Sequence, residues 1–277
     1  MRKLIASCVL VAACGGAKPA TDTTTAANAA QTAATASSSS AAIAAAVAAP
    51  TRTPANVARD AARHPEATLD FFGVTPSQTV VELWPGKGWY TEILAPLLRE
   101  QGKLIAVSPT GNYLQPYKDF LASNPAVYDR VQLVEVTPPA ELTFAPDGTA
   151  DAVLTFRNVH GWVENGYADQ VFAAAFRALK PGGVLGIEEH RAAPGTPAEA
   201  SAKTGYISED AAIAYANKAG FVLDTRSEVN ANPKDTKDYA NGVWALPPSL
   251  KGGDVDKDKY TAIGESDRMT LRFRKPQ

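Results

Sequence analysis

Short apolar runs alternate with helical patterns along most of the chain, and this alternation constrains the fold more than any other feature. Such a pattern is typical of βαβ units around a mostly parallel sheet. The seven runs are TVVELW from Thr79, KLIAVS from Lys103, VQLVEV from Val131, DAVLTF from Asp151, GVLGIEE from Gly183, FVLDTRSEV from Phe221 and MTLRFRK from Met269. No helical pattern is clear between the last two runs, so we expect them to pair antiparallel. The sequence therefore predicts an α/β domain with a seven-stranded, mostly parallel sheet and an antiparallel last strand.

Three helices are predicted between these runs. Apolar residues at helical spacing place one helix from Tyr90 to Glu100 and another from Tyr167 to Leu179, before a Lys-Pro-Gly-Gly turn. Ser208, followed by two acidic residues, is a typical N-cap for a third helix, which Gly220 would end.

The first thirteen residues predict an export signal, because two positive charges precede an apolar stretch that is too short to span a bilayer. Val11-Ala12-Ala13-Cys14 resembles the lipobox of bacterial lipoproteins, in which the cysteine is acylated. The resemblance implies removal of residues 1–13 and a lipid anchor on Cys14. Because Gly15 rather than Asp follows the cysteine, it also implies a cell-envelope protein on the outer membrane, facing the periplasm. The alternative is an ordinary secretory signal followed by a chance cysteine.

Residues 14–50 are almost entirely Ala, Thr and Ser, a composition that predicts a disordered tether. The folded domain is then expected over residues 51–277. Cys8 would leave with the signal and Cys14 would carry lipid, so no intrachain disulfide is expected. The net charge of −2 and the scattered basic residues make nucleic acid an unattractive partner.

One connection is unusually long, from about Asn230 to Asp267, and is rich in Asn, Asp, Lys, Gly and Pro. Loops of this length inside compact domains are usually functional. Trp244 and Tyr239 are large apolar side chains that need a surface to cover, so we predict that this connection forms a lid over the substrate side. A solvated surface insertion is the alternative.

Three segments resemble the motifs of class I S-adenosylmethionine-dependent methyltransferases, in the right order. They are VVELWPGKGWYTEIL from Val80, ADAVLTFRNVHGW from Ala150 and ALKPGGVLGIEEHR from Ala178. The resemblance extends from about Thr68 to Pro276 and implies a Rossmann-like methyltransferase fold. The segments RDAARHPEATLDFFG, ELWPG, FRNVHGW and GESDRM further resemble a bacterial group of predicted methyltransferases. The fingerprint G-x-G-x-x-G is absent, which counts against a nicotinamide cofactor.

The resemblance implies S-adenosylmethionine as the cofactor, with an acidic residue at the end of the first strand and glycines in the turn after it. Glycines are needed there because a Cβ would intrude on a ligand that lies directly on the backbone. The implied cofactor-binding residues are Glu82, Trp84, Gly86, Gly88, Ser108 and Asn158.

The sequence departs from the family pattern at two of these places. Trp84 and Pro85 stand where the family usually has a glycine and a small residue. Ser108 ends the second strand, where an acid usually holds both ribose hydroxyls. These departures concern the affinity for the cofactor rather than the fold.

Ligands of open α/β sheets bind beyond the carboxyl ends of the strands, where His160 and His190 follow the fourth and fifth strands. Either imidazole can take the proton that a hydroxyl or amine acceptor loses. Glu189 or Glu188 would orient the ring of His190, and the predicted catalytic residues are therefore His160, His190 and Glu189. The alternatives are structural hydrogen bonds at strand ends, or catalysis by positioning alone. The lack of close ligand spacing such as H-x-x-x-H argues against a metal on these residues.

Two further groups are ambiguous in the sequence. The aromatic residues of the motifs would either face the cofactor's sulfonium or form core and pocket wall; they are Trp84, Trp89, Tyr90 and Trp162. A charged segment before the first strand would either cap the pocket or form a solvated helix face; its residues are Arg59, Asp60, Arg63 and His64.

The sequence therefore leaves two classes of function. One is a methyltransferase that acts on a small molecule or an envelope component. The other is a non-catalytic ligand-binding descendant of the same fold.

Overall fold

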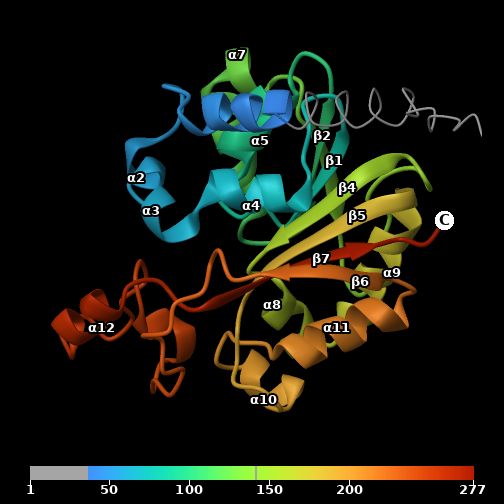
Figure 1. Ribbon diagram of the computed structural model, residues 1–277. Coiled ribbons are helices and arrows are strands. Elements are labelled where there is room, and N and C mark those ends of the chain that lie inside the picture. Colours follow the sequence, from blue (N-terminus) through green and yellow to red (C-terminus); the bar gives the residue numbers. More distant parts are fainter. Residues whose placement is uncertain (1–36, 141) are drawn as a thin grey trace, which may run out of the picture. The chain divides into compact units, whose positions relative to one another are not determined.

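The computed structural model of this chain describes residues 37–140 and 142–277. They contain a seven-stranded sheet of order β3-β2-β1-β4-β5-β7-β6 (Figure 1). The strands are β1 Thr79–Leu83, β2 Lys103–Pro109, β3 Gln132–Val136, β4 Ala150–Phe156, β5 Leu179–His190, β6 Val222–Ser227 and β7 Arg268–Arg274. All seven predicted runs are strands.

The register of the sheet confirms the predicted topology. β1 lies parallel between β2 and β4, with Val81 opposite Ile105 on one side and Val153 on the other. β7 is antiparallel to both β5 and β6. The chain moves outward from β1 to β3 and then returns to the far side of β1 with β4, so the strand order reverses between β1 and β4. In open α/β sheets this switch point is where ligands bind.

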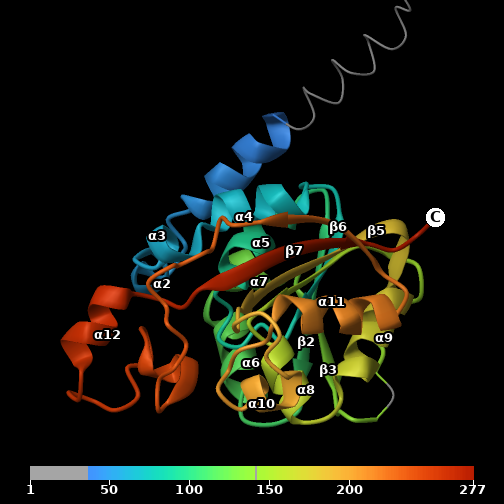
Figure 2. The same ribbon diagram turned by 60° about the horizontal axis from the view of Figure 1, so that its bottom comes forward.

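Helices cover both faces of the sheet, which explains why its central strands read as continuous apolar runs. α4 and α5 lie on one face, and α8, α9 and α11 lie on the other (Figures 1 and 2). Three of these helices are the predicted ones, with ends that differ by at most two residues from the expected bounds. The bounds are α2 Pro54–Val57, α3 Asp60–Arg63, α4 Pro65–Phe72, α5 Thr91–Leu98, α6 Leu114–Ser123, α7 Pro125–Tyr128, α8 Val159–Glu164, α9 Ala168–Ala178, α10 Ala198–Ala202, α11 Glu209–Lys218 and α12 Lys257–Ile263.

The prediction that residues 14–50 form a disordered tether is wrong at its C-terminal end, because residues 37–47 are helical. The side chain of Ile43 is fully buried in the core cluster that also contains Leu69 and Phe72. Ser40 Oγ donates a hydrogen bond to Asp70 Oδ1 at 2.9 Å. Alanine has the highest intrinsic helix propensity, and Ile43 and Ala46 attach this helix to the core. The compact unit therefore begins at Ser38; the signal, Cys14 and the rest of the tether lie outside the described residues.

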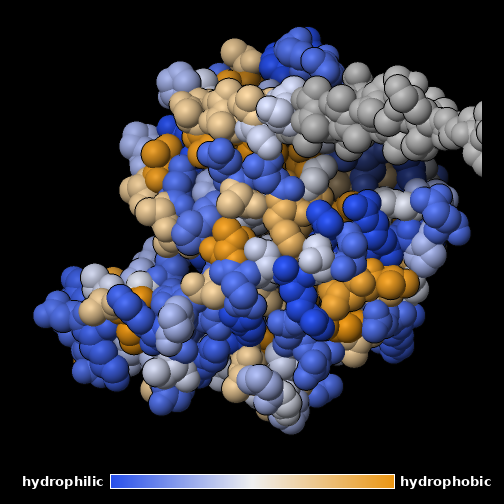
Figure 3. All heavy atoms as spheres, in the orientation of Figure 1, coloured by the Kyte–Doolittle hydropathy of each residue, from blue (hydrophilic) through white to orange (hydrophobic). Residues whose placement is uncertain are grey.

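The connection between β6 and β7 is folded and has two small apolar clusters of its own. One joins Tyr239 and Leu246 to Tyr260 of α12, and the other joins Val243 and Trp244 to the body of the domain. Figure 3 shows the outer face of this insertion, at the lower left, as mostly hydrophilic. Among the described helices, none combines the length and the apolarity that crossing a membrane requires.

Candidate functional site

A cavity of about 530 Å³ lies at the carboxyl ends of β1, β2, β4 and β5. Its volume is in the range of small-molecule sites. Each of the four short segments that resemble the bacterial group contributes to its lining, although they are far apart in the sequence. Their lining residues include Arg59 and Arg63, Glu82 and Gly86, His160 and Trp162, and Glu265 and Ser266.

The turn after β1 exposes its backbone to the cavity at Gly86. Its φ is +61°, and no heavy atom lies within 4 Å of the position that a Cβ would take. Trp84, two residues earlier, has a φ of +49°, the left-handed conformation that favours glycine. The indole of Trp84 packs edge-on against Trp162, with ring centroids 5.4 Å apart. The departure from the family pattern thus keeps the shape of the turn and adds an aromatic wall.

Gly88 has a different role from the predicted one, because it does not line the cavity. Its φ is +83°, and a Cβ there would lie 2.4 Å from a ring carbon of Phe120. Gly88 therefore makes room for the packing of α6 rather than for a ligand.

Glu82 lies at the bottom of the same turn with only 1% of its surface exposed. Its carboxylate accepts a hydrogen bond from Thr91 Oγ1 at 2.6 Å, and Thr91 in turn contacts the hydroxyl of Tyr117. Burial raises the pKa of Glu82 from 4.5 to about 7, against the opposing effect of the Thr91 hydrogen bond. Within the described part of the chain, no lysine or arginine forms an ion pair with this carboxylate.

Replacing Glu82 with glutamine is expected to stabilise the protein above about pH 7. The raised pKa means that the stability due to the protonated carboxyl is complete below pH 4.5 and is lost as the pH rises through about 7. The loss is on the order of 3 kcal/mol, from about 1.4 kcal/mol per pKa unit. Urea unfolding of both proteins at acidic and alkaline pH measures it, with the exposed Glu100→Gln as the control. A stability difference that does not grow with pH would contradict this assignment.

Ser108 and Asn158 lie where the family resemblance implies. Ser108 is buried at the end of β2 and lines the cavity. Asn158 Nδ2 donates to the carbonyl oxygen of Leu83 at 3.0 Å and to Thr155 Oγ1 at 3.1 Å. Asn158 therefore joins the end of β1 to the turn after β4, and it also lines the cavity.

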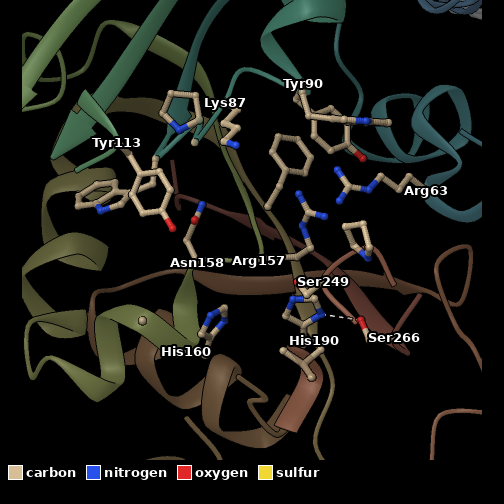
Figure 4. A pocket seen from close by; sticks show the side chains of 18 of the residues that line it. Arg63, Lys87, Tyr90, Tyr113, Arg157, Asn158, His160, His190, Ser249 and Ser266 are labelled. Atoms are coloured by element: carbon tan, nitrogen blue, oxygen red, sulfur yellow. Dashed lines mark hydrogen bonds between the residues drawn. The ribbon is translucent and has the colours of Figure 1, made fainter. Parts of the chain in front are cut away.

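The two predicted histidines face each other across the cavity floor, with ring centroids 5.6 Å apart (Figure 4). His160 Nδ1 lies 3.0 Å from Glu189 Oε1, and Glu189 is fully buried. His190 Nδ1 lies 2.5 Å from Ser266 Oγ. The expectation that Glu189 or Glu188 orients the ring of His190 is wrong: Glu189 orients His160. Adjacent strand residues point to opposite faces, so Glu188 points away from Glu189.

These environments separate the pKa values of the two imidazoles. Burial disfavours the charged form of His160, but the charge and hydrogen bond of Glu189 outweigh it, so the pKa of His160 lies above its ordinary value. The pKa of His190 lies well below its ordinary value, because burial and then the charge of His160 oppose its protonation. His160 therefore holds its proton more strongly than His190, so His190 is the better candidate for the neutral base.

The ambiguous aromatic residues fall into two groups on opposite sides of the cavity. Trp84 and Trp162 form one wall. Tyr90 and Trp89 form the other group: the ring of Tyr90 stacks on that of Phe156 with centroids 3.4 Å apart, and Trp89 lies edge-on to Tyr90. From the insertion, Trp244 lies edge-on to His160 with centroids 6.1 Å apart and lines the cavity, as a lid would. Tyr239 is instead buried inside the insertion.

The charged segment before β1 caps the cavity with two of its four residues. Arg59 and Arg63 line it, whereas Asp60 forms an ion pair with Arg52 and His64 is exposed. In the described part of the chain, no cluster of three or more His, Cys, Asp or Glu residues is arranged to hold a metal ion.

Sequence reasoning missed several lining residues, notably Lys87, Tyr113, Arg157 and Ser266. Arg157 carried a usable signal, because it directly follows β4 and precedes Asn158. Ser266 lies in GESDRM, a segment of the family resemblance, but its contact with His190 could not be predicted because that contact depends on β7 lying beside β5.

Comparison with known proteins supports the fold. No family model and no curated protein matches the sequence. A SAM-dependent methyltransferase from Aquifex aeolicus matches with a TM-score of 0.54 and 18% identity, covering 79% of this chain and 93% of the other. A putative sarcosine dimethylglycine methyltransferase from Galdieria sulphuraria matches with a TM-score of 0.52 and 14% identity, covering 77% of this chain and 88% of the other.

A third solved structure shows how far this likeness extends. The cyclase SpnF matches with a TM-score of 0.54 and 19% identity, covering 78% of this chain and 81% of the other. Proteins with this fold are thus named for different reactions, and the reaction has to be argued from the site. The described chain has the Rossmann-like fold of the class I S-adenosylmethionine-dependent methyltransferases, with its cavity at the switch point of the sheet.

Proposed function

We propose that this protein is an S-adenosylmethionine-dependent methyltransferase that acts on a small molecule. The observation that carries the proposal is the turn after β1, where an open glycine backbone and a buried carboxylate without a cationic partner meet the same cavity. S-adenosylmethionine carries a sulfonium and an ammonium group, and both are complementary to such a carboxylate.

The cavity residues fit this cofactor. Gly86 would let its methionine portion lie on the backbone, and Ser108 would offer one hydroxyl to the ribose. Trp84 provides an aromatic wall, and Asn158 fixes the end of β1. When bound, the cofactor would supply an electrophilic methyl group to the acceptor.

The residues of the chain then have distinct tasks. His190 would take the proton that a hydroxyl or amine acceptor loses as it is methylated. With its Nδ1 donating to Ser266 Oγ, its Nε2 would carry the lone pair. His160, held by Glu189, would keep a positive charge beside it, and Trp244 would exclude water.

Calorimetric titration with S-adenosylmethionine and S-adenosylhomocysteine tests the proposal. The change Gly86→Ala should weaken the binding of both ligands by roughly tenfold or more, because the added methyl group projects into the space that the ligand would occupy. The matched control is Gly148→Ala, since Gly148 has a φ of +67° and equally open surroundings but does not line the cavity. The control should bind normally.

Two results would oppose the proposal. Equal affinity in Gly86→Ala and the native protein would move the cofactor away from this turn. If neither form of the cofactor binds and no acceptor is methylated, the non-catalytic ligand-binding alternative replaces the enzyme.

We also propose that the protein is anchored to the cell envelope through acylated Cys14, facing the periplasm. The support is the lipobox-like sequence before Cys14. The change Cys14→Ser is expected to release the protein from the membrane fraction, as judged by fractionation and by loss of labelling with a fatty-acid probe. Unchanged membrane association would reject the anchor. Cys8→Ser is the control, because residue 8 lies inside the predicted signal.

A further inference from the structure

Four arginines from three separate parts of the chain gather at the edge of the cavity nearest His190. We call them the arginine cluster: Arg59, Arg63, Arg157 and Arg268. Arg59 and Arg63 belong to the segment before β1, Arg157 follows β4, and Arg268 begins β7. Figure 4 shows the guanidinium groups of Arg63 and Arg157 pointing toward each other between Tyr90 and His190.

The arginine cluster has more positive charge than its protein partners neutralise. Glu265 accepts hydrogen bonds from Arg59 Nε at 2.7 Å, Arg63 Nε at 3.2 Å and Arg268 Nη1 at 2.8 Å. The carboxylate of Glu188 lies 3.0 Å from Arg268 Nε. Among the described residues, the four guanidinium groups therefore form ion pairs with only these two carboxylates. Burying positive charge without a partner is unfavourable, so a cluster of this kind is suited to bind an anion.

Unused donors point to the same conclusion. Arg59 Nη2, Arg63 Nη1 and Arg157 Nε are buried without a hydrogen-bond partner in the described chain. Only 2% of the surface of Arg63 is exposed, and its guanidinium lies 4.6 Å from the centre of the Trp89 ring. Arg157 has a φ of +63°, a conformation that a long side chain rarely adopts. Burial of its guanidinium lowers the pKa of Arg157 below its ordinary value, while the residue as a whole is half-buried and lines the cavity.

We propose that the arginine cluster binds an oxyanion of the methyl acceptor, a carboxylate or a phosphate. Planar guanidinium groups match both of these anions in a bidentate manner. The inference rests on the proposed function and names its substrate class: a small anionic molecule.

The position of the cluster favours the acceptor over the cofactor as the source of the anion. Glu265 precedes Ser266, whose hydroxyl contacts His190, so the cluster is joined to the proposed base. Arg268 on β7 lies on one side of β4 in the sheet order, and the turn at Gly86 and the buried end of β2 at Ser108 lie on the other side. An acceptor held by the cluster would place its nucleophilic atom beside His190.

Titration with inorganic phosphate tests the inference directly. Phosphate should raise the unfolding temperature of the full protein in a saturable way, compared with sodium chloride at equal ionic strength. The change Arg157→Gln should weaken phosphate binding by roughly tenfold to a hundredfold, as expected for lost charge-assisted hydrogen bonds. It should leave the unfolding temperature without phosphate unchanged or higher, because it removes an unpaired buried charge. Arg130→Gln, an exposed arginine outside the cavity, should bind phosphate normally.

A second pair of ligands separates the acceptor from the cofactor's own carboxylate. S-adenosylhomocysteine has that carboxylate, whereas methylthioadenosine lacks it. Both ligands should bind to the Arg157→Gln variant with the same affinity as to the native protein. If this variant loses S-adenosylhomocysteine but keeps methylthioadenosine, the cluster holds the cofactor and the inference fails. Arg59→Gln repeats the comparison if Arg157→Gln does not fold.

The remaining outcomes distinguish the two proposals. A native protein that binds S-adenosylhomocysteine but shows no saturable response to phosphate overturns the anion site and leaves the proposed function standing. A native protein that binds phosphate through Arg157 but binds neither adenosyl ligand supports the anion site and removes the methyltransferase.

Discussion

His190→Gln is expected to lower the rate of methyl transfer at neutral pH by roughly a hundredfold or more. Glutamine keeps the size and polarity of the side chain but cannot accept the proton of the acceptor. The ring of His190 is held by Ser266 and stays neutral because burial and adjacent positive charges disfavour its protonation. The rate is measured with a labelled methyl group once an acceptor has been found by screening small anionic hydroxyl and amine compounds.

His160→Gln should behave differently and so serves as an informative comparison. It removes a positive charge that lowers the pKa of His190, so that pKa should rise toward its ordinary value. Because the base must be neutral, the acidic limb of the pH–rate profile should move to higher pH. His64→Gln is the control, since His64 is exposed and does not line the cavity. A normal rate and an unmoved profile in His190→Gln would exclude His190 as the base.

Arg268→Met is expected to destabilise the domain by about 3–5 kcal/mol, the usual effect of removing one partner of a buried ion pair. Arg268 and Glu188 are each at most 1% exposed, and the change leaves the carboxylate of Glu188 without its cation. Tyr90 would remain as a weaker partner, with its hydroxyl 3.3 Å from Glu188 Oε2. Urea unfolding followed by circular dichroism measures the loss.

A double variant tests the cause of this loss. Adding Glu188→Gln to Arg268→Met removes the unpaired charge and should restore a large part of the stability. Arg226→Met is the matched control, because Arg226 forms an exposed ion pair with Glu209 and should change stability by less than about 1 kcal/mol. If the double variant is as unstable as Arg268→Met, the packing of the arginine stem rather than its charge dominates.

The strands could be predicted because each is a short apolar run between turn residues, a local signal. The alanine-rich run from Ala41 favours a helix, but the attachment of the helix over residues 37–47 could not be predicted, because it depends on the burial of Ile43 against α4. The α6 helix was also missed, and its packing is visible in the sequence only through Gly88, which was read as a ligand contact.

The cavity residues show the same division. Four of them lie at or just after the carboxyl ends of strands, which parallel strands bring together, so their convergence could be expected; they are Gly86, Ser108, His160 and His190. The hydrogen-bond partner of each histidine could not be predicted, because it depends on which face of β5 each glutamate occupies and on β7 lying next to β5. The arginine cluster depends on tertiary contacts between segments about 200 residues apart, such as Arg63 with Glu265.

The insertion between β6 and β7 leaves and re-enters the sheet at paired antiparallel strands, where Ser227 lies opposite Thr270. A short turn can join such ends without altering any strand pairing. One apolar cluster lies within the insertion, and a second packs Val243 and Trp244 against Ala192 and Tyr206 of the body of the domain. The wall that Trp244 provides is therefore attached to the sheet only through a loop, and engineered variants with another side chain at Trp244 are expected to change the size of the pocket while the sheet and the turn at Gly86 stay unchanged.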